Sequence, residues 1–88
     1  MTSFPLTISS PDGDLDRGDA SKLIVRGTEG ELAVLAGHIP FVTAVVKSRC
    51  AVVTAEGERK EGEIEEGLLT VDADKVTVLT SDLAWSEK

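Results

Sequence analysis

Hydrophobic and polar residues alternate with a period of two along much of the chain. In residues 4–9 large apolar side chains occupy every second position, and residues 76–80 repeat the pattern. Such alternation is typical of a half-buried β-strand, because successive side chains point to opposite faces of a sheet. Further strands are expected in the short apolar runs at 22–26, 32–35, 41–46, 50–54 and 69–71. No stretch has the periodicity of an amphipathic helix of ordinary length, so the pattern predicts an all-β chain.

Turn residues punctuate these runs. The sequence breaks at 9–13 (SSPDG), 55–58 (AEGE) and 72–75 (DADK), all rich in Gly, Pro, Asp or Ser. Residues 59–65 are polar except for Ile64, which favours an exposed edge strand protected by charge. Short strands at this spacing predict a small β-sandwich or flattened barrel that occupies residues 1–88 as a single domain.

The charge balance narrows the classes of partner. Sixteen acidic and nine basic residues give a net charge of −7. Such a surface repels phosphate backbones and anionic lipid, so we expect neither nucleic-acid binding nor direct insertion into lipid. Two roles for this negative charge remain open: it attracts a basic partner surface, or it only keeps the protein soluble.

The single cysteine and the hydropathy profile indicate the cellular compartment of the protein. Cys50 has no second cysteine to pair with and lies among small apolar residues, so we expect a buried hydrophobe. No basic segment followed by an apolar one opens the chain, and no apolar run approaches a membrane span. These features predict a cytoplasmic protein.

An acidic stretch at 12–19 imitates a calcium loop. Asp12, Asp14 and Asp16 fall at the first, third and fifth ligand positions, but Arg17 and Leu23 stand where an EF-hand needs Gly and Glu. We therefore expect a solvated acidic loop. The Arg-Gly-Asp tripeptide at 17–19 is too short a match to indicate receptor binding.

No catalytic constellation emerges from the sequence. His38 is the only histidine, without partners for a metal site or a catalytic triad. The acidic residues of 56–66 lack pocket-forming aromatics, which favours a solvated face over paired catalytic carboxylates. Phosphate-loop and dinucleotide-binding glycine patterns are absent. We expect no enzyme activity, no cofactor and no metal.

The stretch from Gly27 to Thr43 has specific turn chemistry. Two glycines frame an acidic turn, an apolar run follows, and Gly-His-x-Pro then leads into another apolar run. This stretch resembles the G-E-L-G-x-x-P-G-H-x-P-x-x-T signature of the epsilon subunit of bacterial F-type ATP synthases. Residues 4–11 and 67–81 are similar to the family's first and closing strands, in the same order. Ala33 and Ala36 depart from the family's usual Gly and Pro.

The resemblance implies a fold and a function. The family's epsilon subunit has an N-terminal β-sandwich and a C-terminal helical hairpin, and this chain resembles the sandwich alone. In the family, the sandwich joins the gamma subunit to the c-ring, so that ion-driven ring rotation turns the central stalk. We therefore expect a non-catalytic rotor subunit on the inner face of the cell membrane. Without the hairpin, it would couple rotation but neither inhibit ATP hydrolysis nor bind nucleotide.

Motif position also implies contact residues. Polar loops of the c-ring are expected to meet Glu29, Glu31 and His38. Contact with gamma is expected from Ser10, Phe41, Val42 and Thr43. Plain core packing is the alternative for Phe41 and Val42, and a structural corner is the alternative for His38. For the whole chain, the alternatives are a stand-alone acidic β-sandwich interaction module and a small enzyme.

Overall fold

The described chain consists of strands joined by turns and short loops. The computed structural model describes residues 3–37 and 39–86. The strands are β1 (Phe4–Ser10), β2 (Gly13–Gly27), β3 (Gly30–Leu35), β4 (Phe41–Val45), β5 (Ser48–Thr54), β6 (Arg59–Ile64), β7 (Gly67–Val71), β8 (Val76–Thr80) and β9 (Leu83–Trp85). Within these ranges there is no helix, and hence none long and apolar enough to cross a membrane.

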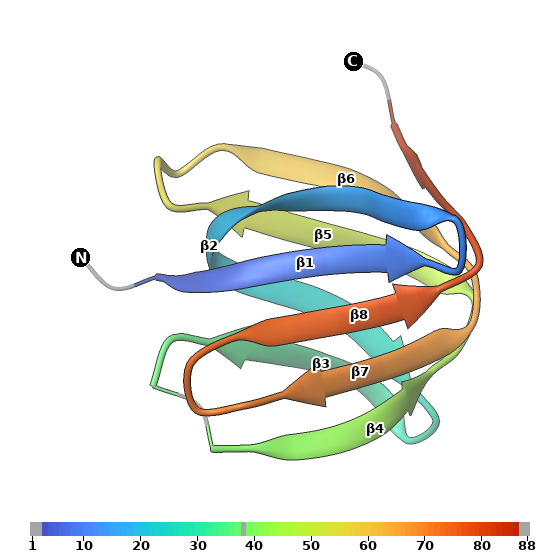
Figure 1. The fold of residues 1–88 in the computed structure, drawn as a ribbon, viewed down its shortest axis with the longest axis horizontal. Coiled ribbons are helices and arrows are strands. Elements are labelled where there is room, and N and C mark those ends of the chain that lie inside the picture. The colour runs from blue at the N-terminus through green and yellow to red at the C-terminus, as the bar shows by residue number, and fades with distance from the viewer. Residues whose placement is uncertain (1–2, 38, 87–88) are drawn as a thin grey trace.

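One long strand connects two layers of sheet. The first half of β2 pairs with β1, and its second half pairs with β3 on one side and β5 on the other. A bulge between Ala20 and Lys22 marks the change of layer. The first layer contains β1, β8, β7 and β4, and the second contains β3, β5, β6 and β9 (Figure 1). The predicted all-β sandwich or flattened barrel is confirmed.

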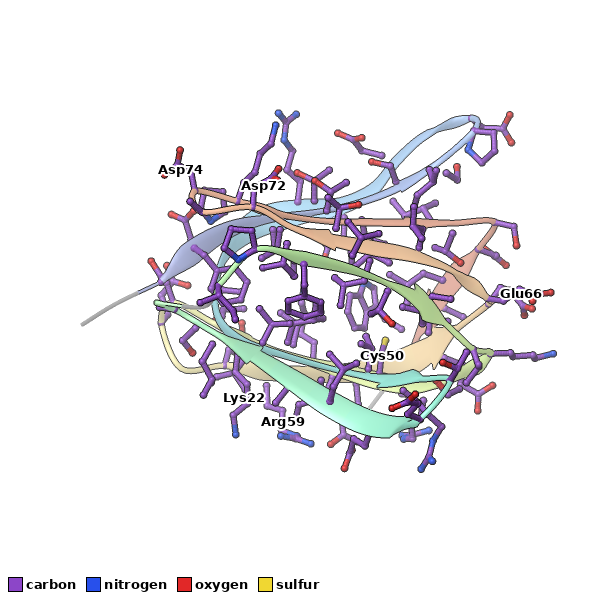
Figure 2. The ribbon with its side chains drawn as sticks, turned by 90° about the horizontal axis from the view of Figure 1, so that it is seen from below. Lys22, Cys50, Arg59, Glu66, Asp72 and Asp74 are labelled. Atoms are coloured by element: carbon purple, nitrogen blue, oxygen red, sulfur yellow. The ribbon has the colours of Figure 1, made fainter. Side chains whose placement is uncertain are left out.

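The core lies between the layers and follows the predicted alternation. Val76, Val78 and Thr80 of β8 are buried, whereas Leu79 is half exposed. Thr80 is a buried polar residue, and its hydroxyl donates to the carbonyl oxygen of Glu65 at 2.9 Å. Cys50 is buried as expected, and Figure 2 shows it between the layers. The fully buried side chains are mainly Val, Leu and Ile.

The acidic segment at 12–19 is not the expected loop. From Gly13 onward it is the first half of β2, with Arg17 paired to Thr7 and Asp14 paired to Ser9. Strand β1 supplies the backbone hydrogen bonds, and the charged side chains point largely into solvent. The expectation was wrong because this strand is specified by its partner rather than by local composition.

Strand β6 is not an edge strand, contrary to expectation. It lies between β5 and β9, and Ile64 is buried. Gly62 makes the second pairing possible, because a Cβ there would overlap the backbone of Ala84 and Trp85. Beyond β6 the layer ends at the three-residue strand β9, so the hydrogen-bonding edge exposed on this side is short.

Candidate functional site

The acidic turn is a tight hairpin between β2 and β3. Thr28 and Glu29 connect Gly27 to Gly30, which pair with each other. Gly30 has a φ of 122°, a conformation that favours glycine. The side chains of Glu29 and Glu31 are both exposed. The hairpin therefore presents both of the predicted acidic contact residues to solvent.

Strand β4 exposes apolar side chains beside this hairpin. Val42 is 62% exposed and points outward, so core packing does not account for it. Phe41 is 37% exposed and, with Thr43, lies on the inner side of β4, where Val45 is buried. Core packing therefore accounts for Phe41 only in part.

A hollow of about 430 Å³ lies between the hairpin and β4. It exists because β3 pairs with β2, whereas β4 meets β2 only where Val45 pairs with Gly27. The hollow is lined by Gly27, Thr28, Glu29, Gly30, Glu31, Leu32, Phe41, Val42 and Thr43. Candidate residues for two different partners thus share one cavity.

The outer face of the first layer carries no charge across four adjacent strands. One row of this face aligns Val42, Thr70, Thr77 and Thr7, and the next aligns Ala44, Leu68, Leu79 and Ser9. These eight residues are called the uncharged face below. Leu68 and Leu79 are 43% and 49% exposed. Charged residues form 28% of the chain, so a face this size without any is a candidate contact surface.

The two remaining predicted contact residues are Ser10 and His38. Ser10 ends β1, and its hydroxyl donates to the carbonyl oxygen of Gly13 and accepts from the amide of Asp12. Across β7 and β8, Phe41 of β4 is aligned with Leu6 of β1. Ser10 lies several residues beyond Leu6 on β1, so it is distant from Phe41 both along the strand and across the sheet. His38 lies outside the described residues.

The structure adds Leu68 and Leu79 to the candidate contact residues. Sequence reasoning passed over both, because adjacent leucines at 68 and 69 do not reveal which one faces outward. A usable signal was the alternation in β8, which places Leu79 opposite the buried Val76 and Val78. Register then puts Leu68 beside Leu79.

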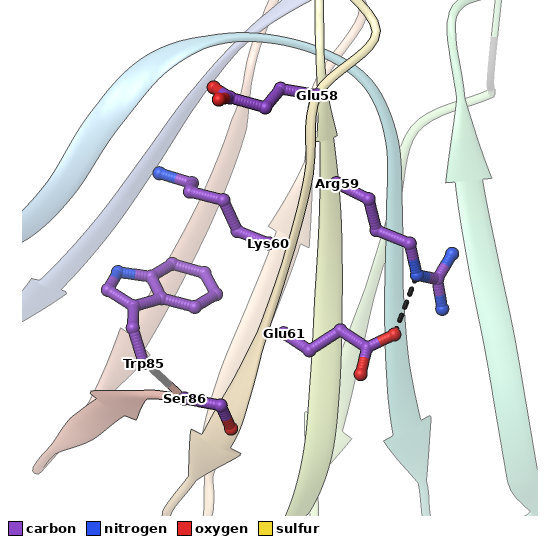
Figure 3. Close-up of a pocket in the computed structure, with 6 residues that line it drawn as sticks. All are labelled: Glu58, Arg59, Lys60, Glu61, Trp85 and Ser86. Carbon is purple, nitrogen blue, oxygen red and sulfur yellow. Dashed lines mark hydrogen bonds and ion pairs between the residues drawn. The ribbon is translucent and has the colours of Figure 1, made fainter. Parts of the chain in front are cut away.

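A second hollow, of about 440 Å³, adjoins the C-terminal strand (Figure 3). Lys60 lies with Trp85 on one side of β6, its Nζ 4.7 Å from the ring centroid and 2.9 Å from Asp16 Oδ2. On the other side, Arg59 Nε donates to Glu61 Oε2 at 2.7 Å. Hydrogen bonds from Arg59 and then Arg49 hold the pKa of Glu61 below its ordinary value. These charges have partners, which favours a structural role for this region.

Neither a reactive thiolate nor a metal-binding cluster is found among the described residues. Burial raises the pKa of the Cys50 thiol to about 11, so it is protonated at neutral pH. No three His, Cys, Asp or Glu side chains of residues 3–37 and 39–86 gather where they could hold a metal ion. The exposed apolar side chains of the uncharged face and the exposed acidic side chains of the hairpin suit contact between proteins.

Comparison with known proteins agrees with this geometry. The model of the ATP synthase delta/epsilon chain, beta-sandwich domain, matches residues 3–86. The chain belongs to this family. An ATP synthase epsilon chain from Ruminococcus albus is 35% identical over 89 residues, covering 100% of this chain and 66% of the relative. A sodium-ion-specific epsilon chain from Acetobacterium woodii is 33% identical, covering 98% of this chain and 65% of the relative. This delta/epsilon-type chain thus spans just under two thirds of the length of both relatives.

Solved structures share the fold of this delta/epsilon-type sandwich. A chain in the cryo-EM structure of the Euglena gracilis mitochondrial ATP synthase, OSCP/F1/c-ring, superposes with a TM-score of 0.88 at 23% identity. That match covers 97% of this chain and 54% of the other. A chain of the Tetrahymena thermophila central stalk/c-ring structure gives 0.77 at 15% identity, covering 94% and 66%. At these identities the likeness supports the fold.

Proposed function

We propose that this delta/epsilon-type sandwich is a non-catalytic part of the rotor stalk. In this role it joins the gamma subunit to the c-ring, so that rotation of the ring by ions turns the stalk. The observation that carries the proposal is the meeting of two unlike surfaces at one hollow. Val42 belongs both to the uncharged face and to the hollow that the acidic hairpin lines.

The uncharged face is suited to gamma. The central part of an interface between proteins is depleted in charge, and its apolar side chains are removed from water on binding. Val42, Leu68 and Leu79 supply such side chains at 43–62% exposure. Phe41 and Thr43 extend the contact into the hollow, and Ser10 lies at the far end of the same layer.

The acidic hairpin is suited to the polar loops of the ring. Glu29 and Glu31 are exposed, so each could approach a basic or polar group without a large desolvation cost. Charges at the rim of an interface favour register and association rate more than affinity. His38 belongs to this proposed contact by its motif position. Assembly of this kind would hold the chain peripherally at the inner face of the membrane.

Two leucines of equal exposure test the gamma contact. Leu79 lies on the uncharged face at 49% exposure, and Leu35 lies on the other layer at 50%. We expect Leu79→Arg to weaken binding to gamma of the same organism at least about tenfold, because a charge would be buried without a partner. Leu35→Arg should change it less than about twofold. Calorimetry and native mass spectrometry measure both.

Two outcomes would contradict the proposal. Equal loss of affinity in both variants would show that the uncharged face has no special role. Absence of any complex between the wild-type chain and folded gamma would favour the stand-alone acidic interaction module.

A further inference from the structure

The outer face of the second layer differs in charge from the rest of the molecule. It carries Lys22 and Arg26 on β2, Arg49 on β5 and Arg59 on β6, and we call it the cationic face. Its carboxylates are Glu31, Glu61 and Glu63, so it is slightly positive in a chain whose net charge is −7. Figure 2 shows Lys22 and Arg59 projecting on one side of the molecule, away from Asp72 and Asp74.

Two of these cations have no ionic partner within the described residues. Arg49 and Arg59 both approach Glu61, at 3.4 Å and 2.7 Å. No carboxylate of residues 3–37 and 39–86 lies within 4.0 Å of the Lys22 or Arg26 side-chain nitrogens. Glu31 is the cross-strand neighbour of Arg26 but makes no ion pair with it. The charge of β2 on this face is therefore available to a partner.

An apolar stripe separates the two unpaired cations. Ile24 lies between Lys22 and Arg26 on the same face of β2 and is aligned with Ala33 on one side and Ala51 on the other. A hollow of about 140 Å³ adjoins Ile24 and Ala51, and its other lining residues are Cys50 and the charged Glu31, Arg49, Arg59 and Glu61. Four residues of strand place Lys22 and Arg26 about 13 Å apart.

We propose that the cationic face docks an acidic segment of a partner protein. The segment would place carboxylates about 13 Å apart, one against Lys22 and one against Arg26, with apolar side chains on Ile24 between them. At physiological ionic strength charges are screened beyond about 8 Å, so the local charge of this face outweighs the distant acidic residues. This surface lies on the opposite layer from the uncharged face and does not depend on gamma binding.

Other polyanions fit the face less well. A nucleic acid is a long, uniform track of phosphates, and the acidic surface around this face, in a chain whose net charge is −7, would repel most of it. An anionic membrane attracts dense clusters of Lys and Arg, whereas carboxylates are interspersed here. An acidic peptide with an apolar centre matches both the spacing and the stripe.

The test is a titration of the 88-residue chain with a synthetic peptide, followed by amide chemical shifts in NMR. The probe is about ten residues long, with glutamates toward both ends and leucine and valine in the centre. We expect saturable shifts around Lys22, Ile24 and Ala51, and affinity that falls with added salt. A peptide with glutamine in place of glutamate should produce none.

Matched charge reversals separate a specific site from net charge. The double variant Lys22→Glu with Arg26→Glu should weaken peptide binding at least about tenfold. The control, Arg17→Glu with Lys75→Glu, changes the net charge equally but lies off the face and should keep affinity within about twofold. Equal weakening by both variants, shifts centred elsewhere, or no saturable shift would overturn the proposal. Tighter binding of a short DNA duplex or of phosphatidylserine vesicles would also overturn it.

Discussion

Replacing Lys60 by Met tests how the two layers are connected near the C-terminal strand. Lys60 extends from β6 to Asp16 on the first half of β2, with 2.9 Å between Nζ and Oδ2. Its Nζ also lies 4.7 Å from the Trp85 ring centroid. Methionine keeps the apolar stem but removes the charge and the donors, so Asp16 loses its ion pair.

The expected cost follows from the exposure of this pair. The Lys60 and Asp16 side chains are 36% and 23% exposed, which places them between surface and buried ion pairs. Exposed pairs contribute about 0.2–1 kcal/mol, whereas breaking a buried pair costs about 3–5 kcal/mol. With about 0.5–1 kcal/mol for the cation–π contact, we expect Lys60→Met to lower the free energy of unfolding by about 2 kcal/mol. That corresponds to a fall in Tm of roughly 8–16 °C for a domain of this size.

Urea unfolding monitored by circular dichroism and Trp85 fluorescence measures the change. The matched control is Lys47→Met, which removes an ion pair with Glu65 at 3.6 Å between side chains 70% and 41% exposed. We expect it to cost less than about 0.5 kcal/mol. If Lys60→Met costs no more than Lys47→Met, the reasoning about the half-buried pair is refuted.

Three further changes test the packing and the titratable groups. Gly67→Ala should destabilise by about 2–3 kcal/mol in thermal unfolding, because an added Cβ would overlap the carbonyl oxygen of Leu79; a wild-type Tm would contradict the β7–β8 packing. Cys50 should react slowly with Ellman's reagent at pH 8 in the folded chain and quickly in urea, because burial raises its pKa to about 11; equal rates would contradict its burial. Glu61→Gln should be less stable than the wild type near neutral pH, because Arg59 lowers the folded pKa of Glu61 below its ordinary 4.5. That difference should disappear as the pH falls through the depressed folded pKa, and a difference that persists in acid would contradict the argument.

The features predictable from sequence were those specified locally. Strand β8 was predicted correctly because the period-two alternation of its residues is enough to place its side chains. The β2–β3 hairpin was predicted correctly because Gly30, directly after the Thr28–Glu29 turn, adopts a positive φ that favours glycine. In both cases the information lies within a few consecutive residues.

The features missed were those specified by a partner strand. Residues 13–20 are a strand because β1 lies beside them, although their composition suggests a loop. Strand β9 is too short to show a period, and without it β6 resembles an edge.

The candidate site divides in the same way. Motif position indicated Glu29, Glu31 and Val42 separately, but only topology shows that they line one hollow. Leu68 joins the uncharged face through register alone. Neither relation can be read from neighbouring residues.

The central proposal is that this chain joins the gamma subunit to the c-ring. Retention of gamma on an immobilised c-ring tests this most directly. We predict that gamma of the same organism stays on the ring when this chain is added and washes off when it is omitted. Glu29→Gln with Glu31→Gln should slow the capture of gamma on the ring and make it less sensitive to salt, while leaving the binary complex with gamma intact, because those side chains are proposed to face the ring. Gamma retention that is unchanged by the chain would contradict the bridging role.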